Sequence, residues 1–311
     1  MATNSLRVSL SCVVALLLTA PLAAQDKDRA AKIAAFNKAL ETLSQAGPMV
    51  ADLGAAQIKV PEGYRFVPKS NIKKFNDLNR DLTSPLEVGV IFPADFDWFV
   101  VLSYHDDGYV KDDEKTQLDQ ETIDAILAAR REGTERSNAE RRKQKMAELT
   151  LRGWEKPPFY DDVTKNLTWG LQIQTKDSDD YNLNYESRIL GRGGYMSANL
   201  VVGRQSFAAA LPVYNQLLAG FAYKDGQKYS EWKAGDKVAA VGLTGLVLGG
   251  AGVLAGKAGL FGKFFAVLAK GGKAIIVVVV AAIAGIVGLF KKMFGGGSSA
   301  ASNPDESAAT E

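Results

Sequence analysis

The sequence is poor in cysteine and histidine, with one of each among 311 residues. Cys12 lies in an apolar N-terminal segment that we expect to be cleaved off. The mature chain would then contain no thiol, which excludes disulfides, thiol nucleophiles and thiolate metal sites. We therefore expect no bound metal and no cofactor.

Net charge is also small. The chain has 37 basic and 35 acidic residues, a formal net charge of +2. A balance this close to neutral produces no overall field that would attract a polyanion, so no nucleic-acid partner is expected. The sequence does contain long apolar stretches, which lie near its two ends.

The N-terminal stretch has the pattern of a secretory signal peptide. Arg7 and the free amino group give a positive start, residues 8–20 are apolar, and small residues lead to Ala24. This order predicts removal of residues 1–24. A retained anchor is the alternative, although the apolar core is shorter than the ~20 residues that a spanning helix needs. Cys12 precedes most of the apolar core, which is the wrong order for a lipoprotein attachment site.

Two further stretches, residues 238–256 and 274–290, contain no charge and are bracketed by lysines. They predict two transmembrane helices within a membrane anchor at residues 230–293. The lysines between them favour a helical hairpin whose loop faces the cytoplasm. The alternative is that only residues 274–290 cross and residues 238–256 pack on the folded domain. Residues 294–311 have the composition of a disordered tail.

Glycines recur along the first of these stretches at alternating spacings of three and four, which places them in one stripe on a helix. Small residues permit close helix packing in lipid, so the stripe predicts packing within the anchor or self-association of the chain. A weakly helical, flexible segment is the alternative. The stripe consists of Gly242, Gly245, Gly249, Gly252, Gly256 and Gly259.

Residues 25–229 predict an exported α+β domain with mainly antiparallel sheet and flanking helices. The third helix would begin with a capping box from Thr116 to Asp119, and its basic C-terminal end would be solvated. Helices are expected at residues 26–45, 71–80, 116–146 and 206–222. Strands are expected at residues 49–53, 56–60, 64–67, 88–92, 98–104, 109–110, 149–154, 159–163, 167–175, 184–190 and 195–202.

Two turns stand out between the expected strands. Asp107-Gly108 predicts a hairpin turn before Tyr109. The glycines of the run from Gly191 to Gly194 are expected to supply positive φ where a second hairpin reverses.

Five ordered motifs resemble those of a known family, the DUF2167 family of membrane-anchored bacterial proteins, over residues 47–293. The motifs are Gly108-Tyr109-Val110-Lys111-Asp112-Asp113, Gly153-Trp154 with Pro157/Pro158-Phe159-Tyr160-Asp161, Thr164-x-x-Leu167-x-Trp169, Asn184-Tyr185-x-x-Arg188-x-Leu190-Gly191-Arg192, and Gly235-Asp236-Lys237-Val238-Ala239 leading into Gly242-Leu243-Thr244. The resemblance implies an envelope protein at the bacterial inner membrane, with its main domain in the periplasm. It implies no activity and no catalytic residues. The motif residues that are site candidates are Tyr109, Trp154, Tyr160, Asp161, Trp169, Asn184, Tyr185, Arg188, Gly191, Arg192 and Asp236.

Few side chains point to catalysis. His105 precedes two aspartates, but an exposed polar residue beside a turn is the simpler interpretation of this arrangement. Paired carboxylates stay open as an alternative, because their pairing is spatial and not sequential. Arg188 and Arg192 are candidates for binding an anion. The acids considered for such a pair are Asp106, Asp107, Asp161 and Asp162.

The sequence therefore predicts a non-enzymatic, membrane-anchored envelope protein whose exported domain binds or scaffolds another component. The expected partners are the lipid bilayer, a second copy of the chain through the glycine stripe, and an unidentified envelope partner. An envelope hydrolase with paired carboxylates is one alternative. A membrane sensor that uses the short loop between the apolar runs as its output is another.

Overall fold

The computed structural model describes residues 22–115, 118–176 and 178–248. All of them belong to the first of two compact units, which spans Met1–Val267. No helix within the described residues is both long and apolar enough to cross a bilayer.

Several expectations concern residues outside the described part of the chain. These are most of the signal peptide, the last part of the first apolar run, the second apolar run and the tail. They stay predictions from the sequence.

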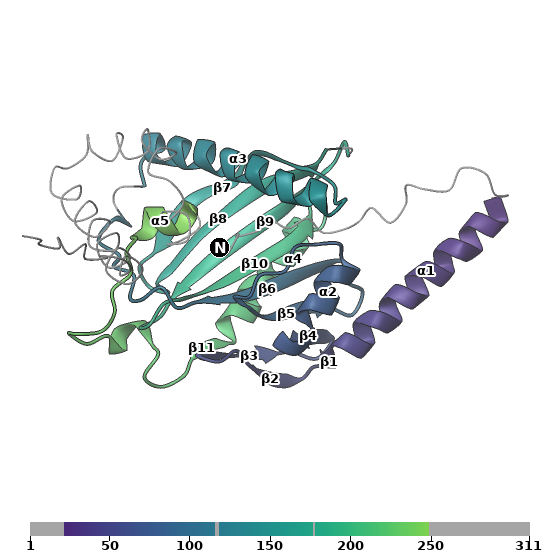
Figure 1. The fold of residues 1–311 in the computed structure, drawn as a ribbon. Coiled ribbons are helices and arrows are strands. Elements are labelled where there is room, and N and C mark those ends of the chain that lie inside the picture. The colour runs from purple at the N-terminus through teal and green to yellow at the C-terminus, as the bar shows by residue number, and fades with distance from the viewer. Residues whose placement is uncertain (1–21, 116–117, 177, 249–311) are drawn as a thin grey trace, which may run out of the picture. The chain divides into compact units, whose positions relative to one another are not determined.

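A large antiparallel sheet of eight strands forms the centre of the fold, in the order β1-β4-β5-β6-β10-β9-β8-β7. It combines two meanders, β4-β5-β6 and β7-β8-β9-β10, which meet where β6 pairs with β10 (Figure 1). A smaller sheet has the order β11-β3-β2. The strands are β1 Gln45–Ala46, β2 Met49–Asp52, β3 Ala56–Val60, β4 Tyr64–Pro68, β5 Glu87–Pro93, β6 Trp98–His105, β7 Leu149–Asp161, β8 Asn166–Thr175, β9 Tyr181–Leu190, β10 Tyr195–Gly203 and β11 Phe221–Tyr223.

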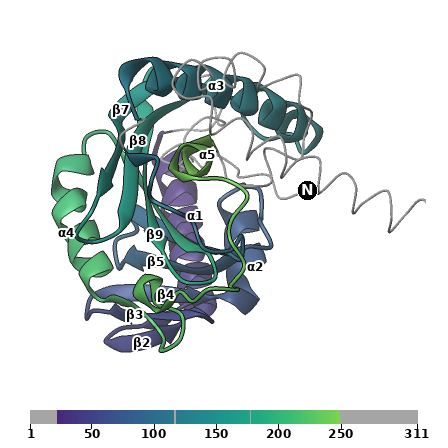
Figure 2. The ribbon, with the colours of Figure 1, turned by 90° about the vertical axis from the view of Figure 1, so that its left-hand side faces the viewer.

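Helices cover both faces of the large sheet. Figure 1 looks onto the face that carries α2, α3 and α5, and Figure 2 shows α4 on the opposite face. The predicted α+β class with a large antiparallel sheet and flanking helices is confirmed. The helices are α1 Leu22–Leu43, α2 Ile72–Leu78, α3 Gln120–Lys143, α4 Phe207–Ala219 and α5 Leu243–Leu248, and the short 3-10 turns are η1 Lys69–Asn71 and η3 Tyr229–Glu231.

Side-chain alternation along β6 separates two cores. Trp98, Val100 and Leu102 face α4 and the small sheet, whereas Phe99 and Val101 face α1 and α2. This is the period of two expected for a strand that is covered on both sides. The first core also contains α4 residues such as Tyr214, which is fully buried and donates to Ala198 O at 3.0 Å.

The second core is aromatic. Phe75 of α2 lies within 6.2 Å of Phe92 and 5.7 Å of Phe99, measured between ring centroids. Leu40 near the end of α1 is 3% exposed and packs in the same cluster, whereas Ile33 of α1 is 48% exposed. The apolar side chains of this helix are therefore buried only toward its C-terminal end.

Helix α3 differs from its prediction at both ends. Its N-cap is Asp119, whose side chain accepts from Thr122 N at 2.9 Å, and not Thr116. The basic end was expected to be solvated, but Arg141 is 4% exposed and pairs with Asp81 at 3.3 Å. Asn138 bonds both backbone groups of Leu149, so polar side chains attach this end of the helix to β7.

The hairpin predicted at Asp107-Gly108 is wrong. Gly108 has a positive φ of 100°, but the chain beyond it does not fold back on β6. Tyr109 instead forms a parallel bridge with Val238, far along the sequence. Strand β11 was also missed, because the helix predicted at residues 206–222 ends at Ala219.

The first apolar run lies partly within the described residues. Residues 238–242 are not helical, and α5 begins at Leu243 with every residue of this short helix buried. Glu114 accepts from both Thr244 N at 3.2 Å and Thr244 Oγ1 at 2.8 Å. Arg130 of α3 donates to Val247 O. The start of this run is therefore packed against the folded domain.

Candidate functional site

One end of the large sheet gathers four segments that carry five of the eleven motif residues named as site candidates. We name it the loop cluster, and it comprises residues 106–115, 161–166, 191–194 and 224–242. Antiparallel pairing explains the gathering: Tyr195 at the start of β10 is opposite His105 at the end of β6. The β7-β8 turn lies at the same end of the sheet, since Asn166 pairs with Ile189.

Backbone hydrogen bonds join these segments to one another. Gly108 N donates to Gly193 O at 3.0 Å, and Tyr109 N donates to Lys237 O at 2.8 Å. Arg192 N donates to Gln227 O at 2.9 Å. The loop cluster is thus held by main-chain contacts as well as by side chains.

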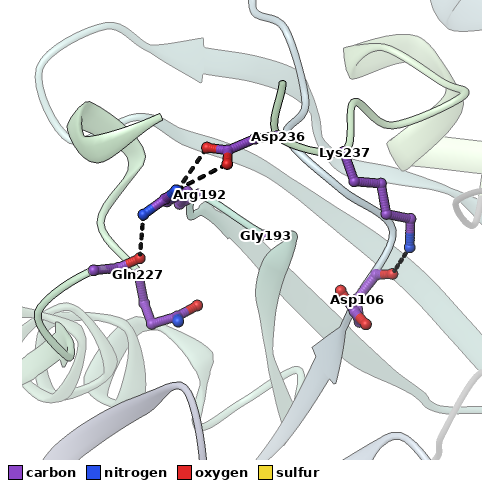
Figure 3. A pocket seen from close by; sticks show the side chains of 7 residues that line it. Asp106, Arg192, Gly193, Gln227, Asp236 and Lys237 are labelled. Atoms are coloured by element: carbon purple, nitrogen blue, oxygen red, sulfur yellow. Dashed lines mark hydrogen bonds and ion pairs between the residues drawn. The ribbon is translucent and has the colours of Figure 1, made fainter. Parts of the chain in front are cut away.

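A hollow of 360 Å³ opens in the loop cluster. Across it Arg192 binds Asp236 through Nε and Nη2, at 2.7 and 2.8 Å (Figure 3). This ion pair, with a further bond from Lys233 N, lowers the pKa of Asp236 to about 2. The hollow is lined by Asp106, Arg192, Gly193, Gly226, Gln227, Asp236 and Lys237.

The hollow still offers polar groups to a ligand. Lys237 donates to the backbone oxygen of Asp106. The side chains of Asp106 and Gln227 make no hydrogen bond or ion pair to the other described residues. A carboxylate and an amide next to a fixed ion pair can bind a ligand through amine or amide groups.

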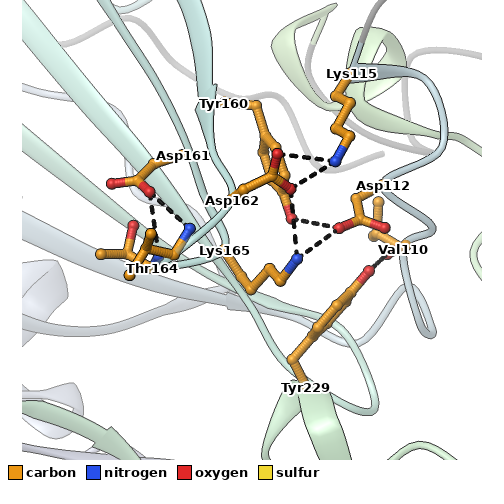
Figure 4. Close-up of polar contacts among 10 residues, drawn as sticks. Val110, Asp112, Lys115, Tyr160, Asp161, Asp162, Thr164, Lys165 and Tyr229 are labelled. Carbon is orange, nitrogen blue, oxygen red and sulfur yellow. Dashed lines mark hydrogen bonds and ion pairs between the residues drawn. The ribbon is translucent and has the colours of Figure 1, made fainter.

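A second polar group lies beside the β7-β8 turn (Figure 4). Tyr160 donates to Asp112 Oδ2 at 2.9 Å, and Lys165 lies 3.0 Å from the same oxygen. Burial raises the pKa of Asp112, but the bonds from Lys165 and Tyr160 outweigh it and leave that pKa lowered. Lys115 pairs with Asp162 at 2.8 Å. Each charge in this group is thus next to an opposite one.

Aromatic rings border this polar group. Tyr109 stacks on Tyr229 with 4.5 Å between centroids, and Trp232 lies 5.2 Å from Tyr109. Tyr229 donates to Val110 O at 2.9 Å. Trp232 is 38% exposed, so one edge of this stack faces solvent.

Beneath the loop cluster, His105 is buried, and the expectation of an exposed polar residue is wrong. It is 5% exposed and stacks on Tyr195 with 4.4 Å between centroids. Its Nε2 lies 3.2 Å from Nη1 of Arg188. Burial and the charge of Arg188 lower the pKa of His105 to about 2. The imidazole is therefore neutral and accepts from the guanidinium.

Arg188 is itself 1% exposed and pairs with Glu186 at 2.8 Å. Its guanidinium carbon lies 5.5 Å from the ring centroid of Trp169 and 4.9 Å from that of Tyr195. The motif residues Trp169 and Arg188 thus meet in the interior, on the sheet face that carries α3.

The glycine run between β9 and β10 forms the predicted turn for a different reason. Positive φ was expected, yet neither Gly191 nor Gly194 is in that region. A Cβ on Gly194 would overlap the backbone oxygen of His105, and one on Gly191 would lie 2.6 Å from the ring of Tyr223. Close approach requires glycine at these two positions.

The four acids considered for hydrolysis have separate surroundings. Asp106 lines the hollow, Asp161 accepts from Val163 N at 2.8 Å, and Asp162 pairs with Lys115. Asp107 lies near the hydroxyl of Tyr195, whose pKa is raised by burial and, to a smaller extent, by this carboxylate. No two of the four therefore share one site.

Two of the four carboxyl groups have a pKa shifted in the wrong direction for hydrolysis. Backbone bonds lower the pKa of Asp161, and Lys115 lowers that of Asp162. Every resolved carboxyl pKa shift among the described residues is downward, the wrong direction for a general acid near neutral pH.

The other motif residues contribute to packing on the two faces of the large sheet. Tyr185 faces α4 and contacts Tyr214, with 5.8 Å between centroids. Asn184 is 3% exposed on the opposite face, and Trp154 is half-buried in β7.

The glycine stripe lies only partly within the described residues. A Cβ on Gly242 would overlap the carboxylate of Glu114, and one on Gly245 would lie 2.6 Å from the Val241 side chain. Gly242 therefore permits packing against the folded domain, and Gly245 permits close packing against the preceding turn of its own segment. Gly249, Gly252, Gly256 and Gly259 lie outside the described residues.

Sequence reasoning missed Glu186, Arg130 and Gln227 as site residues. Glu186 had a usable signal, since it lies two positions before Arg188 in an otherwise well-buried strand and therefore shares its face. Arg130 and Gln227 had none, because their partners lie far away in the sequence.

The fold gives the structural class of the protein, and comparison with known proteins gives its family. The fold is an α+β domain built on a large antiparallel sheet. The chain matches the family described as "Protein of unknown function (DUF2167)" over residues 44–284 and belongs to it. No curated protein matches the chain.

One of the similar solved structures is the solution structure of cyanobacterial PsbP (CyanoP) from Synechocystis sp. PCC 6803. It shares 13% identity with a TM-score of 0.34, and the match covers 55% of this chain and 87% of that chain.

Proposed function

We propose that the chain is a membrane-anchored protein of the bacterial envelope whose folded domain is a binding module. The domain would lie in the periplasm and bind a further envelope component through the hollow of the loop cluster. The observation that carries this proposal is the fixed ion pair of Arg192 and Asp236 beside two uncommitted side chains, Asp106 and Gln227.

The electrostatics of the loop cluster support binding more than catalysis. Arg192 is paired with Asp236, and Lys165 with Asp112, so these charges are held in place. Acid–base chemistry needs a group whose pKa lies near the working pH, and these pairs move the carboxyl pKa values away from it. A rigid frame of paired charges costs little ordering entropy when a ligand binds.

The uncommitted groups indicate the chemistry of the ligand. The carboxylate of Asp106 accepts hydrogen bonds, and the amide of Gln227 both donates and accepts. Trp232, exposed on the neighbouring aromatic stack, adds apolar contact area. A peptide-like segment with amide and amine groups fits this combination.

Site-specific crosslinking in cells tests the binding proposal. A photoreactive amino acid at Gln227 should give adducts of defined mass with an envelope component, and Asp106→Ala should reduce them. The control position is Val50, which is 57% exposed on β2 of the small sheet and does not line the hollow. Equal adducts from positions 227 and 50, or adducts that persist in Asp106→Ala, would contradict the proposal.

For the anchor, we favour a single crossing by residues 274–290. This is the alternative in which the first apolar run packs on the domain, and the burial of Leu243–Leu248 in α5 supports it. Lys291 and Lys292 would then lie on the cytoplasmic side. A topology reporter fused after Gly297 should be active in the cytoplasm, whereas a periplasmic signal would favour the hairpin.

A further inference from the structure

A band of polar side chains crosses the face of the large sheet that carries α3. Arg188 of β9 is opposite Ser197 of β10, and Ser197 is opposite Ser103 of β6. Ser197 donates to Glu186 at 2.7 Å. Helices α2 and α3 lie over the strands on either side of this band (Figure 1). Buried polar groups normally have hydrogen-bond partners, so each one without a partner requires an explanation.

Three buried N–H groups in this region have no hydrogen-bond partner among the described residues: Arg130 Nε, Arg188 Nε and Trp169 Nε1. They lie around one ring. The guanidinium carbons of Arg130 and Arg188 are 5.6 and 5.5 Å from the centroid of Trp169. Trp169 is fully buried and Arg188 is 1% exposed. All three of these groups are donors, and the same face of the sheet also carries unpartnered side-chain oxygens of Asn184, Asn199 and Tyr195.

Charge in the same region is unbalanced. Burial lowers the pKa of Arg130 to about 10, which still leaves it protonated at neutral pH, and Arg188 is also a cation. Glu186 supplies one negative charge and is already paired with Arg188. His105 is neutral there, since burial and Arg188 depress its pKa. Asp107 lies nearby, beside the Tyr195 hydroxyl. Among the described residues Arg130 forms no ion pair with a carboxylate, and an unpaired cation is costly in an interior.

We propose that this region binds a small oxyanion, a carboxylate or a phosphate group. Its oxygens would accept from Arg130 Nε, Arg188 Nε and Trp169 Nε1, and its charge would neutralise the second guanidinium. A cation is the wrong ligand, because the carboxylate of Glu186 is taken. The anion is either free in solution or the headgroup of a lipid, since both present the same oxygens.

This site differs from the hollow of the loop cluster, where Arg192 is already bound by Asp236. Its ligand is an anion, whereas the hollow offers a carboxylate. The anion proposal can therefore fail without affecting the proposed function, and the reverse also holds.

The test uses the full chain in an uncharged maltoside detergent and phosphate-free buffer. The ligands are inorganic phosphate, acetate and an anionic lysophospholipid, and the readouts are calorimetric affinity and the midpoint of thermal unfolding. Wild type should bind one of them saturably and gain thermal stability. Arg130→Gln should weaken binding about tenfold or more, because it removes a charge-assisted donor.

The matched control is Arg136→Gln. Arg136 is an exposed arginine on the same helix, so its loss changes the net charge equally without touching the interior. Its affinity should equal that of wild type. Trp169→Phe keeps an aromatic ring but removes one donor, and should weaken binding by about two- to tenfold. This variant keeps the test decisive if Arg130→Gln does not fold.

Each possible result supports one source of the anion or overturns the proposal. Binding of phosphate or acetate that is lost in Arg130→Gln supports a free anion. Binding of the lysophospholipid alone, with the same loss, supports a headgroup. Absence of binding by all three ligands overturns the proposal, and so does equal affinity in Arg130→Gln or Trp169→Phe.

Discussion

His105 makes the stability of this protein depend on pH between about 5 and 8. Histidine is the side-chain type whose ordinary pKa lies in this range. It is the only histidine of the chain. In the unfolded chain it takes up a proton as the pH falls below its ordinary pKa of 6.5, whereas burial and Arg188 lower its pKa in the folded protein to about 2. The unfolded state therefore binds more protons below pH 6.5, and stability falls as the pH falls.

The size of the effect follows from the unfolded pKa alone, because the folded pKa lies far below the window. About pH 5 lies about 1.5 pH units below the ordinary pKa of histidine. Protonation of His105 in the unfolded state between about pH 8 and about pH 5 therefore lowers the free energy of unfolding by about 2 kcal/mol. For a domain of this size that corresponds to a decrease of about 4–8 °C in the midpoint of thermal unfolding.

The assay is thermal unfolding followed by tryptophan fluorescence across this pH range, on a chain without a histidine tag. His105→Gln removes the titrating group, so its midpoint should stay nearly constant from about pH 8 to about pH 5. A wild-type midpoint that does not change over this range would refute the reasoning. A His105→Gln variant with the same decrease as wild type would do so as well.

Three further predictions concern residues that hold the loop cluster and the end of helix α3 in place. Gly194→Ala should destabilise the domain by about 1–3 kcal/mol or more, because its Cβ would overlap the backbone oxygen of His105. The control Gly153→Ala has open space around its Cβ and should change stability by less than about 1 kcal/mol. Similar unfolding midpoints for the two variants would contradict this prediction. The carboxylate of Asp236 stabilises the fold above its ordinary pKa of 3.8 and stops doing so near its folded pKa of about 2. Wild type should therefore lose stability as the pH falls from about 4 toward 2, and Asp236→Asn should lack this loss. Parallel pH profiles of the two proteins would show that the ion pair adds nothing to stability. Arg141→Met should cost about 3–5 kcal/mol by leaving Asp81 buried without its cation, and Arg141→Met with Asp81→Leu should cost less than Arg141→Met alone; additive losses in urea unfolding would argue against coupling.

The parts of the fold that the sequence predicts are those with local causes. The strands at residues 88–92 and 98–104 follow from runs of branched and aromatic residues, and β5 and β6 lie there. The hairpin of β2 and β3 and the helix α2 also lie where the local pattern indicates. Each of these elements depends on neighbours in the chain.

The failures have non-local causes. Asp107-Gly108 has the composition of a hairpin turn, but Tyr109 finds its backbone partner at Lys237. His105 of β6 is buried by Tyr195 of β10 and Arg188 of β9, the next two strands of the sheet, and nothing close to it in the sequence reveals this. The family motifs did identify Arg192 and Asp236, though not that they form one ion pair.

The segment that leads out of the domain is fastened at four points. Asp236 is held by Arg192, Val238 is bridged to Tyr109, Thr244 is bound by Glu114, and Val247 O accepts from Arg130. Tension applied at the C-terminal end of α5 would therefore load the attachments of Val247 and Thr244 before those of Val238 and Asp236. Mechanical force from that side is borne by helix α3 and by the loops after β6 and β9 before it reaches the strands of the sheet.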